Sequence, residues 1–201
     1  MSFQYVIDNA TSISIAKKKR VAQTVSRSGV VKTTSLGGQV YEFSVSLPNG
    51  FRYSDNRSFI EKVEGLDRTT VDTIQLNNPG HDYISQYQGD VTAPNIVVST
   101  DGTNEITFVS GVTISSGFVF KAGDFIQLGT TGSVYTVIED VLATDSTFRV
   151  HRPVLEADSS YTLQVGQDVS WQVICVELPQ FTIFGYDQVQ WDGNFVFVEA
   201  L

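Results

Sequence analysis

The chain has 201 residues, of which 41% are hydrophobic and 17% are charged, and its formal net charge is −9. This composition excludes a fully disordered chain. Val, Thr, Ser, Gly, Phe and Tyr are plentiful, and strands and turns favour these residues, so we expect a mainly β protein. Neither an apolar run of about 20 residues nor a signal-peptide pattern occurs, which predicts a soluble protein made in the cytoplasm.

Charge is divided unevenly along the chain. Residues 1–70 hold ten basic and six acidic residues, whereas residues 71–201 hold three basic and sixteen acidic residues. Such asymmetry favours oriented contact with charged partners, including other copies of the chain. The alternative interpretation is an acidic surface that only aids solubility.

The single cysteine, Cys175, excludes an internal disulfide framework. It lies in an apolar run over residues 173–176, with no cation or helix terminus evident beside it. We therefore expect a buried, reduced thiol rather than a nucleophile.

Residues 39–47 carry the clearest alternation in the chain. Apolar side chains fall on one face and Glu or Ser on the other, which predicts a half-buried strand; the apolar ones are Tyr41, Phe43, Val45 and Leu47. Shorter strands are predicted at 21–26, 30–34 and 71–76, after an opening Ser and Ile run at 12–15.

One helix is predicted, over residues 56–64. Ser54 or Asp55 is placed to cap its N-terminus, and Gly65 is placed to end it. Phe59, Ile60 and Val63 form an apolar stripe at helical spacing.

A domain boundary is expected near residue 93, because Pro94 ends a polar and aromatic stretch. Short strands then follow at close spacing, separated by turn residues; they are predicted at 96–99, 105–109, 125–128, 134–139, 147–150 and 161–165. A series of this kind is typical of a small barrel, and we predict an inserted OB-like β-barrel over residues 94–166.

Residues 167–201 supply further strands, at 169–178, around 181–183, and at 195–198 after a turn at Asp192 and Gly193. These strands are too few to fold alone. We therefore predict that they complete the sheets begun by residues 1–93, which gives a discontinuous domain interrupted by the barrel.

No catalytic, cofactor or metal site is predicted. His81 and His151 have no metal-ligating neighbour at a recognisable spacing, and we expect solvent-facing imidazoles. The acids Asp140, Asp145, Glu156 and Asp158 fall near strand ends. Paired acids can hydrolyse glycosides and grouped oxygens can bind calcium, but solvated turn residues explain these acids more simply. The expectation is that the protein is not an enzyme.

The basic run Lys17, Lys18, Lys19 and Arg20 is the sharpest charge feature. It is compatible with a nucleic-acid or membrane contact, with an electrostatic contact to an acidic neighbouring subunit, or with a solvated strand edge protected by lysines. We take the four residues as candidate subunit-interface residues.

The predicted barrel has only three cations, Lys121, Arg149 and Arg152, which argues against nucleic-acid binding there. Sugar binding through an exposed aromatic side chain stays open as an alternative function, because OB folds often hold oligosaccharides. Tyr135 and Tyr161 are the candidate glycan contacts. Among partners, no membrane is expected for the protein.

Several short motifs occur together in order along the chain. They are Arg27-Ser28-Gly29, Gly37-Gly38 before the alternating strand, the helix at 56–64, Lys121-Ala122-Gly123-Asp124 with Val134-Tyr135 after it, and a last strand that closes on Glu199-Ala200-Leu201. Together they resemble the distal tail proteins of long-tailed bacteriophages, and the match is closest around residues 121–135.

This resemblance implies a tail-tube-like β-sandwich with one short helix, interrupted by an OB-like domain. It further implies a structural virion protein that forms a hexameric ring between the tail tube protein and the baseplate hub or tail tip. DNA would pass through such a ring without sequence-specific binding, and the family has no active site. The rival function is a carbohydrate-binding module that docks host-surface glycan through the barrel.

Overall fold

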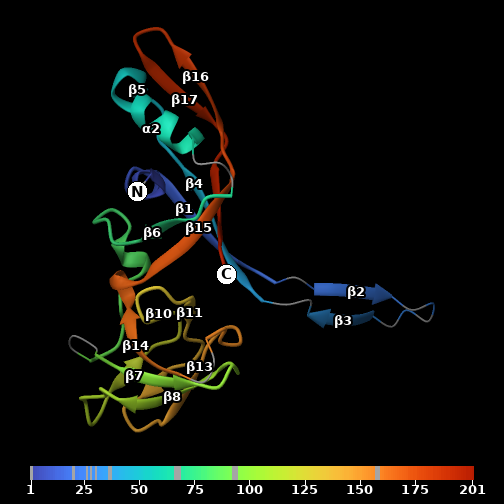
Figure 1. Ribbon diagram of the computed structural model, residues 1–201, viewed down its shortest axis with the longest axis vertical. Coiled ribbons are helices and arrows are strands. Elements are labelled where there is room, and N and C mark those ends of the chain that lie inside the picture. Colours follow the sequence, from blue (N-terminus) through green and yellow to red (C-terminus); the bar gives the residue numbers. More distant parts are fainter. Residues whose placement is uncertain are drawn as a thin grey trace. The chain divides into compact units, whose positions relative to one another are not determined.

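The fold is mainly β, as predicted. The computed structural model describes residues 2–19, 21–25, 27, 29, 31–35, 38–65, 69–91, 95–156 and 159–201. These residues form several β-sheets and two α-helices, α1 (Ser2–Asp8) and α2 (Tyr53–Gly65) (Figure 1). Of the described helices, none is long and apolar enough to cross a membrane.

The chain folds into two compact units. The discontinuous unit comprises Met1–Asp72 and Val173–Leu201, and the middle unit comprises Thr73–Gln172. The predicted insert, residues 94–166, lies inside the middle unit, which is longer at both ends. The two boundaries fall within β6 (Asp72–Gln75) and β15 (Ser170–Glu177).

A five-stranded sheet has the order β1-β4-β18-β15-β6, in which β1 is Ser12–Lys18, β4 is Val40–Ser46 and β18 is Phe195–Glu199. Strand β4 runs antiparallel to both neighbours. Its residues Tyr41, Phe43 and Val45 are completely buried, so the predicted inward face of this strand is confirmed. Cys175 is also buried, as predicted, on β15.

Helix α2 covers the predicted helix and begins three residues earlier, at Tyr53. Helix α1 was not predicted from the sequence. Its apolar residues Phe3, Val6 and Ile7 have helical spacing and are all buried, and Phe3 packs on Phe197 with ring centres 5.0 Å apart. The helical spacing of apolar residues was therefore present in the sequence, but it spans only two turns and is too short to predict a helix.

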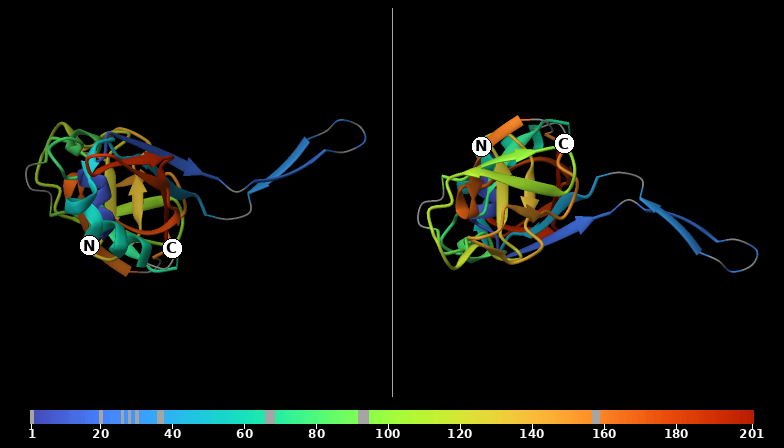
Figure 2. Two further views of the ribbon diagram at one scale, coloured as in Figure 1. Left: turned by 90° about the horizontal axis from the view of Figure 1, so that it is seen from above. Right: turned by 90° about the horizontal axis from the view of Figure 1, so that it is seen from below.

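Two further sheets complete the discontinuous unit. Strands β2 (Val21–Val25) and β3 (Val31–Ser35) form a two-stranded antiparallel ribbon, drawn in blue in Figure 2. A three-stranded sheet has the order β16-β17-β5, in which β16 is Gln180–Phe184, β17 is Gln188–Asp192 and β5 is Phe51–Arg52. Strands β5 and β17 were not predicted.

The middle unit contains a six-stranded sheet in the order β11-β10-β14-β7-β8-β13. A bridge joins Val137, just after β11, to Val150, just after β13. Because β11 and β13 are the two end strands in this order, the bridge curls the sheet around its own core. The bounds are β7 Val97–Thr100, β8 Glu105–Ser110, β10 Phe125–Leu128, β11 Val134–Thr136, β13 Thr147–Arg149 and β14 Ser159–Val165.

The strands predicted in this region are all present. A further pair was not predicted, β9 (Phe118–Phe120) with β12 (Val141–Leu142). Side chains from both sheets share one buried cluster, in which Phe120 and Phe148 lie with ring centres 5.1 Å apart. The middle unit therefore has a hydrophobic core of its own.

The expected boundary at residue 93 differs from the observed one because the preceding segment bonds to the barrel strands. The Tyr87 hydroxyl donates to the Val119 carbonyl, and the Gln88 N–H donates to Asp124 Oδ1 at 3.0 Å. At the other end, Gln127 Nε2 donates to the Ser170 carbonyl at 2.9 Å. These contacts join residues far apart in sequence, which local patterns do not reveal.

Candidate functional site

Residues 121–124, with the sequence Lys-Ala-Gly-Asp, form a turn with a structural role. Asp124 is 1% exposed, and its two carboxylate oxygens accept hydrogen bonds from the N–H groups of Gln88 and Lys121. Burial raises the pKa of this carboxyl group. Gly123 has a φ of 107°, a conformation that side chains disfavour. The carboxylate therefore fastens the segment before the barrel to the turn.

A second polar cluster surrounds Tyr135. Its hydroxyl donates to Glu156 Oε2 at 2.6 Å and accepts from the Leu155 N–H at 2.9 Å. The Ser133 N–H donates to the other oxygen of Glu156 at 2.6 Å. Arg152 lies over the Tyr135 ring, 5.0 Å from its centre. The cluster holds the segment after β13 against β11.

The pKa values in this cluster follow from its contacts. Burial, with the hydrogen bond to Glu156 next in size, raises the pKa of the Tyr135 hydroxyl, so it stays a donor at neutral pH. Burial alone would raise the pKa of Glu156. The hydrogen bonds from Tyr135 and Ser133 outweigh burial, and the pKa of Glu156 is lowered on balance.

The prediction of Tyr135 as a glycan contact is wrong. The side chain has no exposed surface, and its hydroxyl is used inside the protein. Tyr161 is half-buried on β14 and packs against the hydrophobic cluster of the middle unit. The structure does not bring the two tyrosines together on one open face.

The remaining candidates for chemistry serve the fold. His151 is half-buried, not solvent-facing as predicted, and its Nδ1 accepts from the Thr136 N–H at 3.0 Å. Asp140 and Asp145 are exposed and accept from backbone N–H groups of Ala122 and Leu142, as turn residues do. Asp158 lies outside the described residues. Within the described ranges, no three His, Cys, Asp or Glu side chains gather in a way that could hold a metal ion.

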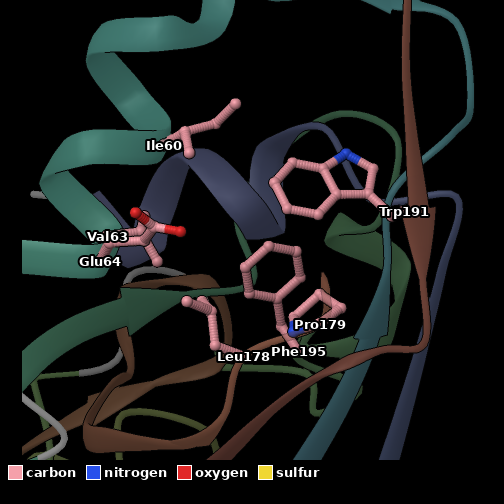
Figure 3. Close-up of a pocket in the computed structure, with 7 residues that line it drawn as sticks. All are labelled: Ile60, Val63, Glu64, Leu178, Pro179, Trp191 and Phe195. Atoms are coloured by element: carbon pink, nitrogen blue, oxygen red, sulfur yellow. The ribbon is translucent and has the colours of Figure 1, made fainter. Parts of the chain in front are cut away.

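One small hollow lies between α2 and the strands β17 and β18 (Figure 3). It leaves about 10 Å³ for the centre of a water molecule, which is room for a single water. Apolar side chains dominate its walls, and Glu64 is its only charged residue; the lining residues are Ile60, Val63, Glu64, Leu178, Pro179, Trp191 and Phe195. A substrate or cofactor does not fit there.

The basic run lies at the end of β1. Lys18 Nζ pairs with Glu42 Oε2 at 2.6 Å, across to β4. The Lys17 ammonium lies 5.9 Å from the ring centre of Tyr41, and partial burial lowers the pKa of Lys17. Lys19 is exposed just after the strand, and Arg20 lies outside the described residues. Lys17 and Lys18 therefore have roles within their own sheet, and Lys19 stays available.

The strands that follow this run, β2 and β3, form what we name the basic hairpin. Residues 9–41 include six Lys or Arg and no Asp or Glu; four of the cations are the run 17–20, and the other two, Arg27 and Lys32, fall within residues 21–35. Val25 and Val31 face each other across the hairpin and are 69% and 56% exposed. Among the described strands, β2 and β3 pair only with each other. Both outer edges of the hairpin are therefore open.

A second exposed feature was missed by the sequence reasoning. Strand β16 ends with Ile183 and Phe184, and Tyr186 lies in the turn to β17; these three side chains are 49%, 50% and 98% exposed. We name residues 183–187 the aromatic tip. Strand β16 is at the edge of its sheet. The sequence signal was two aromatic residues on either side of Gly185 in a turn, where polar residues are usual.

In comparisons with known proteins, no protein-family model matches the chain and no curated protein sequence matches it.

Proposed function

We propose that the chain is a structural subunit of a bacteriophage tail, one that assembles with copies of itself into a closed hexameric ring between the tail tube and the baseplate or tail tip. The basic hairpin is the observation that carries this proposal. The order of the motifs that resemble distal tail proteins supports it independently.

The basic hairpin is incomplete as an isolated element. A lone two-stranded hairpin is at best marginally stable in water, and open strand edges present unpaired backbone groups. The described strands of this chain cover neither edge, and the facing pair Val25 and Val31 stays exposed. Pairing or packing against another chain would bury these groups.

The charge distribution favours a copy of the same chain as that partner. Residues 9–41 carry only positive charges, whereas the net charge of the whole chain is −9. The remainder of each copy is therefore strongly acidic and attracts the basic hairpin of a neighbour. A contact between two different surfaces of one chain generates a ring when its rotation closes.

Light scattering and electron microscopy of the purified chain test this function. We expect closed rings with six copies. The double variant Val25→Asp and Val31→Asp should shift the population towards monomers, because it places acids on the exposed pair of the hairpin. Val109→Asp is the matched control, since Val109 is 56% exposed on β8 of the middle unit. Monomers alone at high protein concentration, with and without tail partners, would contradict the proposal.

A further inference from the structure

We propose that Asn49 is a site of spontaneous covalent modification, at which loss of ammonia converts the asparagine into aspartate or isoaspartate, and that the pairing of β5 with β17 sets the rate of this reaction. The reactive pair is Asn49 and Gly50, in the turn between β4 and β5. The inference does not depend on the proposed ring, because the reaction needs only this turn and water.

The sequence distinguishes Asn49 from the other asparagines of the chain. The reaction begins when the backbone nitrogen of the following residue attacks the side-chain amide carbon of the asparagine. A following glycine has no side chain to hinder this approach, and it leaves the backbone free to adopt the conformation that ring closure needs. Asn49 is followed by Gly50, whereas each of the other asparagines precedes a residue that carries a side chain.

The structure exposes this pair and explains why glycine is present. Asn49 and Gly50 are both exposed, so water reaches the side-chain amide. Gly50 has a φ of 99°, a conformation that residues with a side chain disfavour. The turn between β4 and β5 therefore requires the same glycine that makes Asn49 reactive.

The modification needs water and no other co-reactant. The Gly50 nitrogen loses its proton and bonds to Asn49 Cγ, while the bond from Cγ to Nδ2 breaks and ammonia leaves. A cyclic succinimide remains, and water then adds to either of its carbonyl groups. Opening at the side-chain carbonyl gives aspartate. Opening at the backbone carbonyl gives isoaspartate, in which the main chain continues through the side-chain carbon.

Hydrogen bonds to β17 restrain this reaction in the folded chain. The Gly50 N–H donates to the Val189 carbonyl at 3.1 Å, and the Trp191 N–H donates to Asn49 Oδ1 at 3.4 Å. The first bond directs the attacking nitrogen towards β17, so it must break before the ring can close. Strand β5 has only two residues, and a short strand opens locally at a low cost in free energy. The rate of modification therefore reports the opening of β5 from β17.

The two products affect the neighbouring strands differently. Isoaspartate adds a backbone carbon atom shortly before Phe51, which pairs with Val189. The register of β5 against β17 depends on the spacing of the backbone there. Aspartate leaves the backbone unchanged and keeps an oxygen that can accept from the Trp191 N–H. We therefore expect isoaspartate to weaken the attachment of β5 more than aspartate does.

Peptide mapping by mass spectrometry tests the site. The full chain is incubated at mildly alkaline pH, with and without denaturing urea, and isoaspartate is counted with an isoaspartate methyltransferase. In urea we expect Asn49 to exchange its NH₂ group for OH ahead of every other asparagine. Without urea we expect the same reaction to be at least about tenfold slower, because the bond to Val189 must first open.

Two variants and the aged protein complete the test. Asn49→Gln should lose the isoaspartate signal, because the longer side chain closes a ring less readily. Asn194→Gln is the matched control, since Asn194 is also exposed but precedes Phe195, and its isoaspartate yield should equal that of the unaltered chain. The isoaspartate form, separated by ion exchange, should unfold at a lower temperature than Asn49→Asp.

Each part of the inference has a contrary result. Modification of Asn49 in urea that is no faster than that of the other asparagines would overturn the site. Equal rates with and without urea would overturn the control by β5 and β17. Equal unfolding temperatures for the isoaspartate form and Asn49→Asp would overturn the effect of backbone spacing. None of these results bears on whether the chain forms a ring.

Discussion

At the scale of single residues, the buried Asp124 and the half-buried Glu156 of the middle unit serve as acceptors for backbone N–H groups. Asp124 receives two such bonds, and Glu156 receives one together with the Tyr135 hydroxyl. Tyr87 adds a half-buried donor, and burial raises its pKa to about 12, so it remains protonated at neutral pH. These groups fasten loops to strands.

Asp124→Ala should lower the free energy of unfolding by about 2–3 kcal/mol, because it leaves the N–H groups of Gln88 and Lys121 without their acceptor. Urea denaturation measures the change. Asp140→Ala is the matched control, since Asp140 is exposed and accepts one backbone hydrogen bond, from Ala122. The Asp140→Ala variant should lose less than about 1 kcal/mol of unfolding free energy. Equal losses in the two variants would contradict the structural role of Asp124.

Glu156 should make the folded chain less stable in acid. Its folded pKa lies below the ordinary value of 4.5, so its contribution is fully present above pH 4.5 and is lost as the pH falls through the lower, folded pKa. Glu156→Gln should therefore destabilise the chain most at neutral pH, and the difference from the unaltered chain should shrink in acid. Urea denaturation at a series of pH values measures this difference.

Tyr135→Phe provides the comparison, because it removes one donor to Glu156 and keeps the acid. It should reduce the pH dependence of stability rather than abolish it. A destabilisation by Glu156→Gln that is the same at every pH would show that the hydrogen bonds of Glu156 do not favour its charged form.

At the scale of elements, helix α2 depends on a residue far away in the sequence. Asp187, in the aromatic tip, accepts from the N–H and the hydroxyl of Ser54 in the first turn of the helix. The acid thus satisfies a backbone N–H that the helix itself leaves open, and its negative charge lies at the positive end of the helix dipole. The sequence suggested Ser54 or Asp55 as the N-terminal cap. In the structure, Asp187, from the turn between β16 and β17, also caps the helix.

Asp187→Ala should cost about 1–2 kcal/mol of unfolding free energy, since it removes the capping acceptor and leaves a residue that tolerates the positive φ poorly. Thermal unfolding followed by circular dichroism measures the change. Asp187→Asn keeps an acceptor and tolerates this φ, so it should cost less. If Asn proves as damaging as Ala, the acceptor role of Asp187 is wrong.

At the scale of the whole molecule, the chain divides into two compact units, and the divisions fall within β6 and β15. The middle unit begins at Thr73, earlier than the predicted insert, and ends at Gln172. Val91 belongs to its hydrophobic cluster, and Tyr87 packs against that cluster. The segment before residue 94 therefore contributes to the core of the middle unit.

Residues 73–172 expressed alone should unfold cooperatively and at a higher temperature than residues 94–166. The shorter piece lacks Val91, Tyr87 and the partner of Gln127 at Ser170, and loss of such core residues costs about 2–5 kcal/mol. Calorimetry of the two fragments beside the full chain measures the difference. An equal or higher unfolding temperature for residues 94–166 would favour the boundary at residue 93.

The sequence predicts an element or a site residue correctly where the pattern that specifies it is local. Alternation along residues 39–47, the apolar stripe of α2 and the turn residues between the barrel strands are local patterns, and the elements they predict are present. Strands β5, β9 and β12 were not predicted; they have only two or three residues each, so they are too short to show a clear period. Tyr135 was predicted to contact glycan because it is aromatic, but aromatic character does not distinguish a buried ring from an exposed one.

The sequence by itself determined the mainly β fold, the inward face of β4, the position of α2 and the separation of charge along the chain, because composition and short-range periodicity suffice for these properties. Only the tertiary structure decided that Tyr135 and Glu156 bond to each other inside the middle unit, and that Asp187 holds the start of α2. It also decided which apolar residues stay exposed, those of the basic hairpin and the aromatic tip. The physical reason is that burial depends on which strands pair, and that pairing joins residues far apart in the chain.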